Sequence, residues 1–146
     1  MRPIRLYWPA LVVAMLVSFL FEAGWFSFFL KPWLAGIGRS MEWLMSQPRV
    51  TLPIQFAVAL LCSFVTAAVL SVCIQASGEQ TFFRGIKVAA VLWLGFIATT
   101  LAKDYIFEVR PLSLFAINAA YGLCDLVLMG AIVGAWKGKP KAFAVS

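Results

Sequence analysis

One long stretch without charge constrains this chain more than any other feature of its sequence. The 29 positions from 50 to 78, between Arg49 and Glu79, contain no charged residue. A helix of about 20 predominantly apolar residues is long enough to cross the hydrocarbon core of a bilayer. The stretch is too long for a strand of a membrane β-barrel and lacks its alternating pattern. It therefore predicts a transmembrane helix over about residues 52–76.

Three further apolar segments have the length to span a bilayer, over about residues 7–30, 86–107 and 112–136. The composition agrees, because 63% of the residues are hydrophobic and only 12% are charged, whereas soluble domains have about 25% charged residues. We therefore expect an all-α membrane protein, a single four-helix transmembrane domain over residues 1–146. The first segment is expected to be retained, because no small-residue cleavage motif follows it.

The loop after the first segment, about residues 31–51, is the longest one. Within it, apolar residues recur at helical spacing against the polar residues Arg39, Ser40 and Glu42. This pattern predicts a short amphipathic helix over 33–45 that lies in the membrane interface. The alternative is an irregular loop whose apolar side chains dip into lipid. The apolar positions are Trp33, Leu34, Ile37, Met41, Leu44 and Met45.

Basic residues predict the orientation of the chain, because they are enriched in cytoplasmic loops. The side that carries both termini and the second loop has seven of them: Arg2, Arg5, Arg84, Lys87, Lys137, Lys139 and Lys141. The opposite side has five: Lys31, Arg39, Arg49, Lys103 and Arg110. We therefore expect both termini in the cytoplasm, with the three C-terminal lysines facing anionic lipid.

Five polar residues in or near the predicted spans form the candidate intramembrane site. Ionisable groups inside a membrane are functional candidates, because an isolated charge in hydrocarbon is costly. The candidates are Glu22, Lys103, Asn118, Tyr121 and Asp125.

The rise of about 1.5 Å per residue along a helix puts Glu22 and Lys103 at similar depth, so an ion pair between them is geometrically allowed. In the alternative, Lys103 reaches up to the membrane surface and pairs with Glu108 or a lipid phosphate. Asp125 lies deeper, so it is expected to be protonated or to contact polar groups, for which the candidates are Ser18, Ser63 and Thr99.

Small residues recur every four positions along the predicted helices, as they do where membrane helices pack closely. We expect Gly122, Gly130 and Gly134 to contact another helix, within the chain or in an oligomer. The stripes are Ala10, Ala14, Ser18 and Glu22 in the first segment, Gln55, Ala59, Ser63, Ala67, Ser71 and Gln75 in the second, and Gly95, Thr99 and Lys103 in the third.

The residues that many enzymes and metalloproteins require are missing. The chain has no histidine, which removes the commonest general base and the commonest metal ligand. Cys62, Cys73 and Cys124 have neither metal-binding spacing nor a neighbouring base. Phosphate-binding loops and a soluble basic face for nucleic acid are missing as well. We therefore expect no enzymatic activity, no cofactor, no metal site and no nucleic-acid partner.

Several motifs resemble a widespread bacterial family of small four-helix membrane proteins known only as a domain of unknown function. The resemblance covers about residues 10–136, and its last block is the most specific part. It implies a bacterial inner-membrane protein and brings no activity, substrate or cofactor. The motifs are Gly24-Trp25-Phe26-Ser27, Lys31-Pro32-Trp33, Gly36-Ile37-Gly38, Trp93-Leu94-Gly95-Phe96, Arg110-Pro111, Leu114-Phe115-Ala116-Ile117-Asn118, Tyr121-Gly122-Leu123 and Met129-Gly130-Ala131-Ile132.

Two functions fit these observations. The first is a structural or accessory helix-bundle protein that acts through helix contacts in the lipid bilayer, in a homo-oligomer or with a larger membrane complex. The second is a small proton-coupled transporter that uses Glu22 and Asp125. A charge-swap test of Glu22 against Lys103 separates them, because an unpaired Glu22 favours the transporter.

Overall fold

The computed structural model describes residues 4–48 and 51–136, and this part of the chain is helical with no strand. Four helices have the length and hydropathy to cross a membrane: α1 (Trp8–Phe28), α4 (Thr51–Ala76), a continuous helix over Phe82–Phe107, and α7 (Leu112–Ala135). The expected fold class, an all-α membrane protein with four spans, is thus confirmed. The third span begins at Phe82 rather than near Ile86.

The first span ends at Phe28, two residues earlier than expected, and the chain bends there into α2 (Leu30–Gly36). Pro32 explains the bend. It has no N–H to donate to the carbonyl of Phe28, and its ring crowds that carbonyl, so a straight helix cannot continue. Phe29 takes up the change with a backbone outside the helical region (ψ 14°).

The first loop contains two short helices, so the single helix expected over 33–45 is wrong. α2 stops at Gly36, and α3 covers Met41–Met45. Gly38 adopts a left-handed backbone (φ +67°) that breaks the helical path. The loop bonds from Gly38 N–H to the Ala35 carbonyl and from Arg39 N–H to the Leu34 carbonyl form a Schellman motif, which ends a helix. The helical spacing of apolar residues continues across this break, although the helix itself ends.

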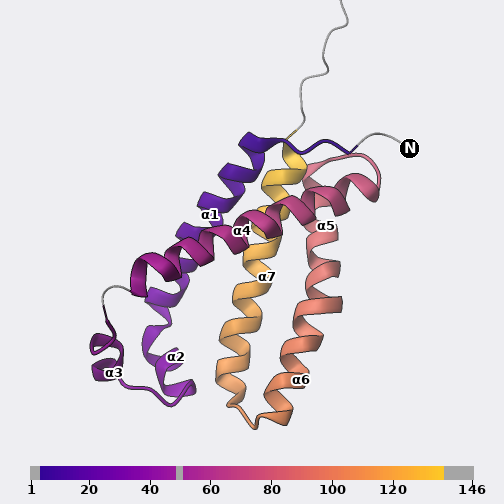
Figure 1. The fold of residues 1–146 in the computed structure, drawn as a ribbon. Coiled ribbons are helices and arrows are strands. Elements are labelled where there is room, and N and C mark those ends of the chain that lie inside the picture. The colour runs from indigo at the N-terminus through magenta and orange to yellow at the C-terminus, as the bar shows by residue number, and fades with distance from the viewer. Residues whose placement is uncertain (1–3, 49–50, 137–146) are drawn as a thin grey trace, which may run out of the picture.

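The third span is one helix with an unusual middle. It consists of α5 (Phe82–Leu92), a π-helical segment η1 (Trp93–Ala98) and α6 (Thr99–Phe107). The indole N–H of Trp93 donates a hydrogen bond to the Ala119 carbonyl of α7, at 3.1 Å. The π segment therefore lies where the third span is tied to the fourth. In Figure 1, α5 and α6 run alongside α7.

The hydrophobic core occupies only one half of the bundle. It lies between the first half of α1, the second half of α4, α5 and the second half of α7. Its buried members are Leu11, Ala14, Ala67, Leu70, Ile74, Ala89, Leu126, Met129 and Val133. The other half contains fewer buried apolar residues, among them Leu34, Tyr105, Leu114 and Ile117. The candidate site lies where α4 leaves this packing.

α4 diverges from the bundle towards its N-terminus. All its buried residues lie between Ser63 and Ile74, whereas residues 52–58 are exposed. Figure 1 shows α4 crossing α1 and α7 obliquely. The result is a wedge between α1, α4 and α7 that is closed at the core and widens away from it.

The ends of the described chain meet on one side of the bundle. Arg5 N–H donates to the Gln75 side chain near the end of α4, and the Gln75 amide donates back to the Arg5 carbonyl. The Gln80 side chain, in the α4–α5 loop, donates to the Val133 carbonyl near the end of α7. These contacts place the start of α1, the α4–α5 loop and the end of α7 together, as four antiparallel crossings require.

Candidate functional site

A cavity of about 520 Å³ occupies the wedge between α1, α4 and α7. α1 contributes Glu22, and α7 contributes Tyr121, Asp125 and Met129. α4 contributes the remaining lining residues, which are Ile54, Gln55, Val58, Ala59, Cys62, Ser63 and Thr66. Both carboxylic acids predicted to lie inside the membrane therefore face one cavity, together with several hydroxyl and amide groups.

Asp125 is the most deeply buried charged residue of the site, with 9% of its surface exposed. It lies near the middle of α7, where the helix is farthest from both membrane surfaces. Its Oδ1 atom is buried and has no hydrogen-bond partner among the described residues. Buried polar atoms in proteins nearly always have a partner, so an unsatisfied oxygen in a cavity indicates a position that another molecule or a proton can fill.

The base of the wedge is polar. The hydroxyl groups of Ser18 and Ser63 form a buried hydrogen bond of 3.2 Å between α1 and α4. Ser18 also lies within interaction distance of the Asp125 carboxyl group, and Ser63 lines the same cavity. The expectation that Asp125 has Ser18 and Ser63 as neighbours agrees with this geometry. Thr99 is exposed on α6 and donates to the Gly95 carbonyl instead.

Glu22 lies one turn beyond Ser18 on the same face of α1. It lines the same cavity as Asp125. The predicted ion pair between Glu22 and Lys103 is wrong, because Lys103 is exposed on α6 and the ion pair found among the described residues joins Arg110 and Glu108. The rise per residue gives the depth of a side chain but not the direction in which it points around the helix.

Tyr121 connects the cavity to an aromatic cluster. Its ring stacks on Phe21, with the ring planes 11° apart, and lies 5.0 Å from the centre of the Phe26 ring. The Trp25 ring is also close, at 6.4 Å, and its buried indole N–H has no partner among the described residues. Through Tyr121, the acidic cavity therefore adjoins a cluster of rings from α1.

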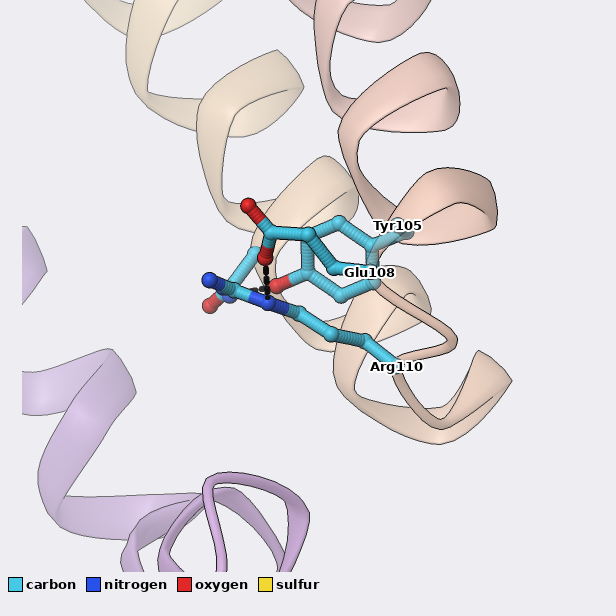
Figure 2. A network of polar contacts seen from close by, with 4 residues as sticks. Tyr105, Glu108 and Arg110 are labelled. Atoms are coloured by element: carbon cyan, nitrogen blue, oxygen red, sulfur yellow. Dashed lines mark hydrogen bonds and ion pairs between the residues drawn. The ribbon is translucent and has the colours of Figure 1, made fainter.

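Asn118 is not among the lining residues of the acidic cavity, and it contacts a polar cluster near the α6–α7 turn. Figure 2 shows Tyr105, Glu108 and Arg110 of this cluster. The Asn118 side-chain amide donates a hydrogen bond to the hydroxyl group of Tyr105. Arg110 stacks over the Tyr105 ring at 5.3 Å and pairs with Glu108. Of the five candidate polar residues, the fold thus brings together Glu22, Tyr121 and Asp125, and separates Asn118 and Lys103 from them.

The glycines of α7 lie at the contact with the third span. A Cβ atom on Gly130 would come within 2.5 Å of the Gly85 carbonyl oxygen, and one on Gly134 within 2.5 Å of the Thr81 carbonyl oxygen. Gly122 meets the side chains of Trp93 and Ile97 at ordinary distances of 3.4–3.6 Å. The Gly130–Gly134 motif therefore serves contact within the chain, at α5.

Sequence reasoning missed Cys62 and Thr66 as cavity residues. They form a row with Val58 at four-residue spacing, beside the small-residue stripe that contains Ala59 and Ser63. The stripe of Ala59 and Ser63 was the sequence signal that could have identified this face of α4. Among the described residues, groups of three or more potential metal ligands do not occur, and the cavity is lined by two acids without a basic residue.

Comparison with known proteins supports the family resemblance. The chain matches the family model described as protein of unknown function (DUF1761) over residues 9–134. Comparison with curated proteins and with solved structures gives no significant match. Because the matched region contains most of the chain and nearly the full length of all four spans, the chain belongs to the DUF1761 family.

Proposed function

We propose that this protein is a small proton-coupled membrane carrier whose coupling site is the pair Glu22 and Asp125. The supporting observation is that both carboxyl groups face one cavity and that no Lys or Arg is among its described lining residues. A structural role would favour acids that are neutralised by a basic partner. The missing Glu22–Lys103 pair therefore favours the carrier over the accessory protein.

The free-energy cost of placing charge inside the membrane favours proton or cation binding at this site. Two carboxylates in a low-dielectric cavity repel each other, and no Lys or Arg among the described lining residues offsets their charge. A shared proton, or a bound cation that replaces one, removes this cost. Cation binding then releases a proton, and proton binding releases the cation, which is the exchange that a coupled carrier requires.

The shape of the bundle supports access from one side at a time. The packed core closes the wedge near the start of α1, and the divergence of α4 leaves the cavity open at the other end. Alternating access then requires α4 to close on α1 while the core end loosens. Four helices per chain offer little room for a complete aqueous pathway, so the proposal includes a second copy of the chain.

Proton release from proteoliposomes tests the proposal. Vesicles with an acidic interior and an internal pH dye are exposed in turn to sodium, potassium, tetramethylammonium and benzyltrimethylammonium chloride. We expect at least one cation to raise the internal pH in wild-type vesicles. Glu22→Gln and Asp125→Asn should each reduce this rate at least tenfold, because either change removes one exchangeable proton from the site.

Glu42→Gln is the matched control, because Glu42 is an exposed acid on α3, away from the cavity. It should leave the rate unchanged. Failure of every cation to move protons, or equal rates in wild type and Glu22→Gln, would contradict the carrier.

The accessory role remains the second candidate, and the exposed first half of α4 favours it. Leu52, Ile54, Phe56 and Val58 lie on this half and are all exposed, so a partner helix could pack there. Native mass spectrometry from a mild detergent separates the two roles. A carrier is expected as a homo-oligomer, and an accessory protein as a complex with a different membrane protein that Glu22→Gln does not disrupt.

A further inference from the structure

A second cavity adjoins the acidic one and has a different character. It has a volume of about 220 Å³ and lies between α1 and the diverging half of α4. Glu22, Gln55 and Ala59 line both cavities. The remaining lining residues of the second cavity are Phe19, Ala23, Phe26 and Phe56. Glu22 is therefore the carboxylate at the junction between a polar cavity and an aromatic one.

The rings of the second cavity form a connected surface. Phe19 of α1 and Phe56 of α4 meet edge to face, with ring centres 5.6 Å apart. Phe26 continues the surface towards Tyr121, which lines the acidic cavity. Faces of aromatic rings attract cations, and their apolar surface gains free energy when a hydrocarbon group covers it.

We infer that the cargo of the proposed carrier is an amphiphilic organic cation, an ammonium group that bears an aryl or alkyl body. This inference rests on the proposed function and specifies its substrate class. The ammonium group binds between Glu22 and Asp125, which both line the acidic cavity. The apolar body lies in the aromatic cavity, against Phe19, Phe26 and Phe56.

The exposed residues around the two cavities support the same class of cargo. Ile54, Phe56 and Val58 are exposed on α4 and line one or the other cavity. In a bilayer this part of the helix faces lipid, into which amphiphilic cations partition. A small inorganic cation would use the acidic cavity alone and would leave the aromatic one without a role.

Three probes separate the contributions of charge and hydrocarbon. Benzyltrimethylammonium has both, tetramethylammonium has the charge without the ring, and neopentylbenzene has the shape of benzyltrimethylammonium without the charge. Binding to the purified full-length protein is measured by calorimetry for the cations and by competition for neopentylbenzene. We expect benzyltrimethylammonium to bind at least tenfold more tightly than tetramethylammonium, and neopentylbenzene not to compete with either.

Phe56→Leu tests the ring directly, because Leu keeps the apolar surface and Phe56 is exposed enough for folding to tolerate the change. It should weaken benzyltrimethylammonium binding about fivefold, the size of one contact between two aromatic rings, and leave tetramethylammonium binding unchanged. Phe83→Leu, at an exposed position near the start of α5, is the control and should change neither. Glu22→Gln should abolish binding of both cations.

The outcomes distinguish the cargo from the carrier. Equal affinity for the two cations, or no effect of Phe56→Leu, would overturn the inference about cargo; the carrier itself stands if cations still drive proton release that Glu22→Gln abolishes. Absence of cation-driven proton release in wild type would overturn both. If Glu22→Gln does not fold, the comparison of Phe56→Leu with Phe83→Leu still decides the cargo.

Discussion

At the scale of single residues, Val109 has the least favourable backbone among the described residues. It is a β-branched residue in the left-handed region, with φ 53°, where valine is a clear outlier. Its N–H bonds to the Ile106 carbonyl, and the N–H of Arg110 bonds to the Tyr105 carbonyl. This is the Schellman motif that also ends α2, where the corresponding residue is Gly38.

Val109→Gly should therefore stabilise the protein. A left-handed backbone costs an L-residue about 1–2 kcal/mol, and the greater freedom of glycine in the unfolded chain offsets part of the gain. Because the Val109 side chain is 88% exposed, little packing is lost. We expect a gain of about 1 kcal/mol in unfolding by sodium dodecyl sulfate titration. The reverse change, Gly38→Val, should destabilise by a similar amount, and a stabilising Gly38→Val would contradict the explanation.

The acidic site shows which residue-level features the sequence could predict. That Glu22 and Asp125 lie inside the membrane follows from their positions in apolar segments. Their shared cavity was harder to predict, because it depends on how α1 and α7 are rotated about their axes. The small-residue stripe that contains Ser18 and Glu22 indicated in part which face of α1 points into the bundle, since Ser18 bonds to Ser63 of α4. Lys103 was misassigned because depth alone was compared.

At the scale of elements, the closest approach of backbone to backbone at any described glycine lies between α5 and α7. A Cβ atom on Gly85 would overlap the Gly130 carbonyl group and lie 3.2 Å from the Gly134 Cα atom. Backbone atoms cannot move aside as a flexible side chain can. Glycine at these positions allows the close approach through which membrane helices gain packing.

Gly85→Ala should separate α5 from α7 and destabilise the protein by about 1–3 kcal/mol, the usual cost of overpacking. Gly24→Ala is the matched control, because a Cβ atom there has nothing within 4 Å and alanine favours the helix. Unfolding by sodium dodecyl sulfate, followed by circular dichroism, measures both. An equal effect of the two changes would show that the seam is not the source of the loss.

The elements also show how far sequence reasoning extends. The apolar runs predicted the four spans within a few residues, because span length is set by membrane thickness. The end of α1 depends on Pro32 alone. The break at Gly38 was missed, because apolar periodicity continues through it. The π-helical segment that begins at Trp93 has no periodic signal in the sequence, and it lies where Trp93 bonds to α7.

At the scale of the whole molecule, the bundle has a packed half and an open half, and two native cysteines report on this division. Cys62 and Cys124 are both exposed, but Cys62 lines the acidic cavity and Cys124, on α7, does not. If the wedge contains water, a charged methanethiosulfonate reagent should reach Cys62 but not Cys124, which faces lipid.

The test uses two proteins in native-like nanodiscs, one that retains only Cys62 and one that retains only Cys124. Mass spectrometry after a short exposure should show at least tenfold faster modification of Cys62, because the reagent needs an ionised thiol in water. A neutral, membrane-permeant maleimide serves as the control for accessibility. Equal protection of both cysteines from the charged reagent would mean that the wedge is dry, which opposes a proton-coupled site.

The expected orientation of the protein in the membrane depends on the basic residues near its C-terminus. We expect both termini in the cytoplasm because of the bias of seven basic residues against five. Lys137, Lys139 and Lys141 supply this bias and lie outside the described residues, as do Arg2 and Arg49. The side assignment itself agrees with the contacts that join Arg5 to Gln75 and Gln80 to Val133.

Cysteines introduced at Ser40 and at Ser77 test this orientation in intact cells, in a background without Cys62, Cys73 and Cys124. An impermeant maleimide should label Ser40→Cys, between α2 and α3, and should not label Ser77→Cys, after α4, until the cells are opened. Replacing the three C-terminal lysines by glutamine leaves four basic residues against five. Labelling of both sites in that variant is then expected, because a weakened bias gives two orientations. Labelling of Ser77→Cys alone in the parent protein would invert the topology and put the open end of the wedge on the cytoplasmic side.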